Sequence, residues 1–169
     1  MMQRRTLLTL GAISAAALAV TGGTLALLQP GLRDGTLSAS GRQVFLGVSR
    51  ALLDGSLPAG AKALQRALEG LLGRIDGLVA ALPPHAQAEL SQLLALLASA
   101  GGRRALAGVG QPWESAQVAE IQQGLQSMRV SRITLRQQAY QALHDIVGGA
   151  YFSDLGTWSL LGYPGPAKI

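Results

Sequence analysis

The chain has 169 residues, a length that suits one compact domain with a modest hydrophobic core. Hydrophobic residues make up 49% of it, but aromatic residues only 4% and charged residues 14%, which favours close-packed helices over a β-sandwich. The chain has no cysteine, so disulfides, thiolate zinc sites, iron–sulfur clusters and covalent c-type haem attachment are excluded on it.

The formal net charge of +5 overstates the basic character of the folded part. Arg4 and Arg5 belong to the N-terminal segment, and removing them from the 14 basic residues leaves 12 against nine acidic ones. The one other arginine doublet, Arg103 and Arg104, has no interleaved aromatic residues that could stack on bases, and we interpret it as a solvated helix start. The sequence therefore predicts no nucleic-acid partner.

Residues 1–29 have the form of an export signal, because a basic start precedes an uncharged apolar stretch. Two adjacent arginines followed by an aliphatic pair resemble a twin-arginine signal, with Arg4, Arg5, Leu7 and Leu8 as the signal residues. The motif is incomplete around the arginine pair, so a Sec signal is an alternative. Either route predicts a periplasmic location for the rest of the chain.

The fate of this leader is open. A small-x-small pattern at Ala17-Leu18-Ala19 fits a cleavage site. The uncharged stretch from Thr6 to Leu28 has 23 residues, however, which is enough to span a hydrocarbon core of about 30 Å. Cleavage would release a soluble domain, whereas retention would make the stretch a signal anchor in the inner membrane.

After a short linker at residues 30–37, apolar residues recur every three or four positions and predict a helical bundle over residues 38–152. The fold class is therefore all-α: a single bundle of five to six helices after the N-terminal signal or anchor helix, without a strand of any length. Ser38, Ser115 and Ser131 are expected as N-caps, and Pro84 as the first residue of a helix. The expected helices are about 38–53, 59–82, 85–100, 103–107, 115–128 and 131–152.

The C-terminal residues 153–169 change character to an irregular, aromatic and proline-rich tail. With the end of the last helix they hold four of the seven aromatic residues of the chain. Such a segment cannot bury itself, so it packs on its own bundle or docks on another protein. The candidate partner-binding residues are Tyr151, Phe152, Trp158, Tyr163, Pro164 and Pro166.

Catalytic chemistry is not indicated by the remaining polar residues. His85 lies at a helix start, where we expect it to be exposed, and neighbouring positions such as His144 and Asp145 point about 100° apart on a helix. No zinc-protease, nucleophile-elbow or phosphate-loop motif occurs, and the acidic residues are dispersed. We therefore expect no catalytic, cofactor-binding or metal-binding residue on this chain. An enzyme hypothesis would depend on the His144–Asp145 pair and the glutamates near Trp113.

Three parts of the chain carry a family resemblance: the leader, Leu52–Pro58 (Leu-Leu-Asp-Gly-Ser-Leu-Pro), and the C-terminal residues Tyr151–Asp154, Trp158 and Gly162–Pro166. Together they resemble gluconate 2-dehydrogenase subunit 3, the small subunit of periplasmic flavin-dependent dehydrogenases. The resemblance is closest in the C-terminal residues.

This resemblance implies a non-catalytic accessory subunit. It implies that a large FAD-dependent oxidoreductase of the glucose–methanol–choline type, made without its own signal, binds the small subunit and is exported with it through the Tat translocase. FAD would then lie on the partner, and a cytochrome c subunit with haem c would complete some complexes at the inner membrane. The alternative is a membrane-anchored helical interaction protein with a retained N-terminal helix.

Overall fold

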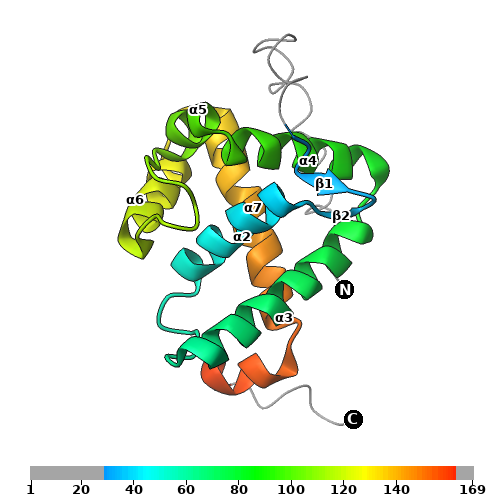
Figure 1. Ribbon diagram of the computed structural model, residues 1–169, viewed down its shortest axis with the longest axis vertical. Coiled ribbons are helices and arrows are strands. Elements are labelled where there is room, and N and C mark those ends of the chain that lie inside the picture. The colour runs from blue at the N-terminus through cyan, green and yellow to red at the C-terminus, as the bar shows by residue number, and fades with distance from the viewer. Residues whose placement is uncertain (1–28, 163–169) are drawn as a thin grey trace.

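The computed structural model describes residues 29–162, and within them the all-α prediction is confirmed (Figure 1). The elements pack as one bundle around a shared hydrophobic core. The helices are α2 (Ala39–Leu52), α3 (Ala61–Ala80), α4 (Pro84–Ala98), α5 (Ala100–Gly102), the π-helix η4 (Arg103–Ala107), α6 (Val118–Arg129), α7 (Thr134–Phe152) and the 3-10 helix η5 (Leu155–Leu161).

A short hairpin precedes the first described helix, so the expectation of a strand-free linker at residues 30–37 is wrong. Strands β1 (Leu32–Arg33) and β2 (Thr36–Leu37) pair antiparallel. The turn residues Asp34 and Gly35 both have positive φ, 50° and 75°, which is the geometry of a tight two-residue hairpin. Because Leu32 and Leu37 are buried, this segment contributes to the core.

The central helix α2 packs against α3, α4, α6 and α7. The predicted cap at Ser38 is confirmed, since its Oγ accepts a hydrogen bond from the Gly41 amide at 3.2 Å. The side chains of Val44, Phe45 and Val48 have no exposed surface. The helix therefore supplies the middle of the core, as its apolar periodicity indicates.

The other predicted helix starts are only partly correct. Helix α4 begins with Pro84, as expected. Helix α6 begins at Val118, three residues after the expected cap, because the Ser115 hydroxyl donates to the Pro112 carbonyl in the preceding turn. Ser131 likewise stabilises the turn before α7 by accepting from the Ile133 amide. Both serines thus use their side chains in turns rather than as helix caps.

Trp113 closes the core between α2 and α4. Its indole is 3% exposed, and Nε1 donates to the Leu97 carbonyl at 2.7 Å. Gly47 of α2 faces the ring so closely that an added Cβ would lie 2.9 Å from a ring carbon. The loop between η4 and α6 is therefore held down by a buried aromatic anchor.

Arg103 departs from its predicted role as part of a solvated doublet. Arg104 is exposed, but Arg103 is only 6% exposed and its Nη1 donates to the Ala98 carbonyl at 3.4 Å. That carbonyl lies at the C-terminus of α4, where a cation is favoured by the helix dipole. Arg103 is thus a buried residue that covers the end of α4.

Candidate functional site

Three of the predicted docking residues, Tyr151, Phe152 and Trp158, lie at the end of the molecule where α7, η5 and the loop between α2 and α3 meet (Figure 1). Tyr151, in the last turn of α7, is 7% exposed, and its hydroxyl donates to the Ser56 carbonyl at 3.1 Å. Its ring meets that of Phe152 edge to face, with centroids 5.2 Å apart. Tyr151 therefore ties α7 to the α2–α3 loop and is mostly covered by its own domain.

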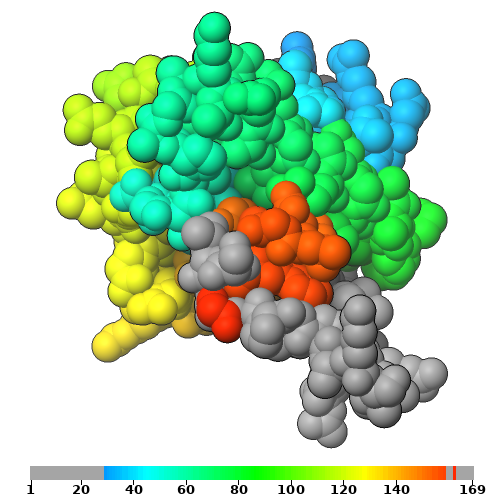
Figure 2. All heavy atoms as spheres, turned by 90° about the horizontal axis from the view of Figure 1, so that it is seen from below, coloured from blue at the N-terminus to red at the C-terminus, as the bar shows by residue number. Residues whose placement is uncertain are grey.

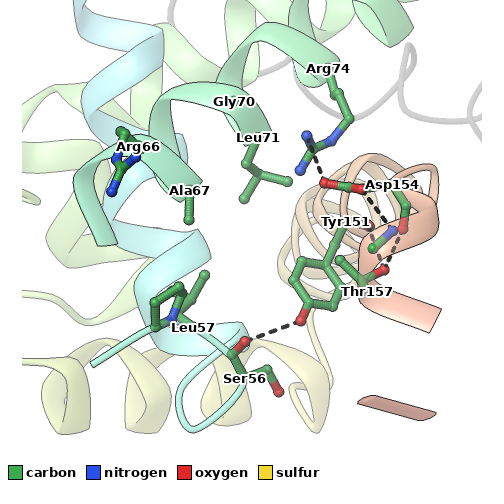
Figure 3. A pocket seen from close by; sticks show the side chains of 12 residues that line it. Ser56, Leu57, Arg66, Ala67, Gly70, Leu71, Arg74, Tyr151, Asp154 and Thr157 are labelled. Atoms are coloured by element: carbon green, nitrogen blue, oxygen red, sulfur yellow. Dashed lines mark hydrogen bonds and ion pairs between the residues drawn. The ribbon is translucent and has the colours of Figure 1, made fainter. Parts of the chain in front are cut away.

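Two hollows flank Tyr151, and Ser56 lines both of them. The first hollow, about 240 Å³, opens between the α2–α3 loop, α3 and η5 (Figure 3). The second, about 300 Å³, lies between the end of α2 and the outer side of α7. Lining residues of the first include Leu57, Arg66, Arg74, Asp154 and Thr157, and those of the second include Leu52, Leu53, His144, Val147 and Phe152.

A polar clamp fixes η5 against α7 and α3 (Figure 3). Arg74 donates from Nε to the Ala150 carbonyl at 2.8 Å and pairs through Nη1 with Asp154 at 3.3 Å. The buried Thr157 hydroxyl bonds to the carbonyls of Tyr151 and Asp154, at 3.1 and 2.8 Å. Arg74 thereby satisfies a carbonyl near the C-terminus of α7 while it orients the following segment. These contacts hold residues 153–157 against α7 and α3.

The clamped segment presents apolar side chains to solvent. Phe152 is 44% exposed and Leu155 is 69% exposed, while Trp158 is half-buried and donates from Nε1 to the Phe152 carbonyl at 2.8 Å. We call Phe152, Leu155 and Trp158 the C-terminal apolar face. Figure 2 shows the orange segment after α7 at the molecular surface beside α3. Leu155 was not predicted as a site residue, because a single leucine in a short segment has no periodicity that would separate an exposed position from a buried one.

The remaining predicted docking residues, Tyr163, Pro164 and Pro166, lie outside the described residues. So do the signal residues Arg4, Arg5, Leu7 and Leu8 and the apolar stretch from Thr6 to Leu28. Among residues 29–162, no helix is both long enough and apolar enough to cross a bilayer.

His144 and Asp145 contact each other, so the expectation that they point apart is wrong. Nδ1 of His144 lies 3.2 Å from Oδ1 of Asp145, which also accepts from Gln141 at 2.8 Å. The short carboxylate reaches around the helix surface to its neighbour, and the Tyr140 ring stacks on the imidazole with centroids 5.6 Å apart. Both side chains remain open to water, with 52% and 36% of their surface exposed. The contact is therefore on the surface of α7.

Within residues 29–162, no three or more histidine or acidic side chains are grouped so that they could hold a metal ion. His85 is exposed at the start of α4, as predicted.

Comparison with protein-family models, curated proteins and solved structures gave no match to this chain. Any function of the site must therefore be argued from its geometry, which is a clamped, outward-facing apolar segment beside two hollows.

Proposed function

We propose that this chain is a non-catalytic small subunit that escorts a large FAD-dependent oxidoreductase of the glucose–methanol–choline type to the periplasm and stabilises it there. The FAD belongs to the partner, and a cytochrome c subunit is a further partner at the inner membrane. The substrate pocket is then part of the partner and not of this chain.

The observation that carries this proposal is the C-terminal apolar face. Exposed aromatic and aliphatic side chains are typical of the centre of a protein interface. Here they lie on a segment that Arg74, Asp154 and Thr157 already hold in place. A pre-ordered segment loses less conformational entropy when it binds, so the clamp favours docking. The adjoining hollows offer room for side chains of a partner.

The N-terminal sequence supports the export part of the proposal. Arg4 and Arg5 followed by Leu7 and Leu8 resemble a twin-arginine signal, and the Tat route accepts folded cargo. A flavoprotein that binds FAD in the cytoplasm needs such a route. One signal on the small subunit would serve both proteins.

A second candidate function is a membrane-anchored helical interaction protein. It is favoured by the 23-residue uncharged stretch from Thr6 to Leu28. Osmotic shock distinguishes the two versions, because a cleaved subunit is released with the periplasmic contents whereas an anchored one stays with the membrane fraction.

The proposal is tested by affinity purification of the C-terminally tagged full chain from its native host. We expect a yellow eluate with flavin absorbance and one large protein in fixed stoichiometry, identified by its sequence as a flavin-dependent oxidoreductase. A stable, colourless chain that elutes without a large partner would refute the escort function.

A further inference from the structure

The corner between α6 and α7 exposes two large aliphatic side chains. Val130 is 65% exposed and Ile133 is 59% exposed. Arg129 directly precedes Val130 and Arg132 directly precedes Ile133, and both arginines are exposed as well. Two exposed branched aliphatic residues, each directly after an arginine, are an unusual surface for a loop of a folded domain, because such side chains contribute nothing to solubility.

The arginines at this end of the molecule have no carboxylate partners among the described residues. Arg136 connects α7 with η4 and α6, since it donates from Nε to the Leu106 carbonyl of η4 at 2.8 Å and from Nη2 to Ser127 of α6 at 2.9 Å. Arg104 on η4 adds a further exposed cation, and no acidic residue occurs in residues 97–113 or 121–144. Within the described chain, none of the arginines on η4, α6 and α7 forms an ion pair with a carboxylate.

We propose that this basic–aliphatic corner, Arg104 with Arg129–Ile133, binds the surface of an anionic membrane. Aliphatic side chains gain free energy when they enter the boundary between headgroups and acyl chains, and flanking arginines reach lipid phosphates while their stems cover apolar surface. Each basic residue near an anionic bilayer adds attraction that salt screens. The aliphatic side chains of the corner thus match the acyl-chain boundary, and its arginines match the anionic headgroups.

Other occupants fit the corner less well. A stable protein partner buries about 800 Å² on each side and uses an aromatic-rich core, whereas this corner offers two aliphatic side chains and no aromatic one. Nucleic acid would use the arginines but would gain nothing from Val130 and Ile133. The corner lies at the start of α7, and the C-terminal apolar face lies at its other end, so both surfaces are usable at once (Figure 1).

Because the chain has no cysteine, a single dye can report on this corner. The full chain is prepared as Ile133→Cys and, as the control at the opposite end, Leu155→Cys, whose wild-type side chain is 69% exposed. Both are labelled with the same polarity-sensitive dye and mixed with vesicles of phosphatidylcholine, with or without phosphatidylglycerol. The N-terminal apolar stretch is common to both variants, so a difference between them reports on the corner.

We expect a blue shift of the dye at position 133 with anionic vesicles only, and none at position 155. Arg129→Gln with Arg132→Gln in the Ile133→Cys chain should weaken the response at least about tenfold, and added salt should weaken it too. The proposal is overturned by no shift at position 133, by equal shifts with both vesicle types, or by equal shifts at both positions. A shift with polyglutamate but not with vesicles would instead assign the corner to an acidic protein.

Discussion

Replacing Trp113 by alanine is expected to lower the free energy of unfolding by about 3–5 kcal/mol. The indole is 3% exposed and fills the space that Gly47 leaves on α2. Its Nε1 also satisfies the Leu97 carbonyl near the C-terminus of α4, which would be left without that donor. Because whole domains are stable by only about 5–15 kcal/mol, this single change would remove a large share of the stability.

Urea unfolding followed by far-ultraviolet circular dichroism measures this effect. Trp113→Phe keeps most of the buried ring and should cost less than the alanine variant, because it loses the hydrogen bond and only part of the packing. Val130→Ala, at a side chain that is 65% exposed, should stay within about 0.5 kcal/mol of the wild type. If Trp113→Ala were as stable as Val130→Ala, the conclusion that Trp113 anchors the loop before α6 would be wrong.

Leu155→Asp is expected to weaken binding of the flavoprotein partner by about 2 kcal/mol, which is roughly 30-fold in Kd. Leu155 is 69% exposed in the free chain, so the change leaves the bundle intact. In the complex the same position would place a carboxylate among apolar groups, where an unpaired charge is costly. The measurement is a titration of the purified partner with each form of the small subunit.

The matched control for this prediction is Val130→Asp. Val130 is 65% exposed and lies at the other end of α7, so the two variants introduce the same charge at equally open aliphatic positions. Both should melt near the wild-type temperature, and only Leu155→Asp should bind weakly. Equal affinities of the two variants would exclude the C-terminal apolar face from the interface.

The helices of the bundle could be predicted because each carries a strong apolar stripe, such as Val44 and Val48 on α2. Only some of their starts could be predicted, such as Ser38 and Pro84, since a serine before a helix can serve a turn or a cap with the same side chain, as Ser115 and Ser38 show. The hairpin was missed because two-residue strands have no alternation to read. Asp34-Gly35 was its one local signal.

At the candidate site, the direction of individual side chains could not be predicted from the sequence. Tyr151 and Phe152 are neighbours with similar rings, and the sequence does not separate their roles. In the structure the 100° step between them turns Tyr151 into the core and Phe152 to solvent. Arg103 is buried and Arg104 is exposed for the same reason, because the burial of each side chain depends on what packs against the helix. Long-range contacts such as that of Arg74 with Ala150 have no local signature.

The most direct test of the escort function is the location of the partner flavoprotein when the signal of this chain is changed. In the native host, Arg4→Lys with Arg5→Lys is introduced into the full chain, and flavoprotein and FAD are measured in cytoplasmic and periplasmic fractions. We predict that the partner, still carrying FAD and still bound to this chain, accumulates in the cytoplasm. A partner that reaches the periplasm in normal amounts despite the altered arginines would contradict the escort function.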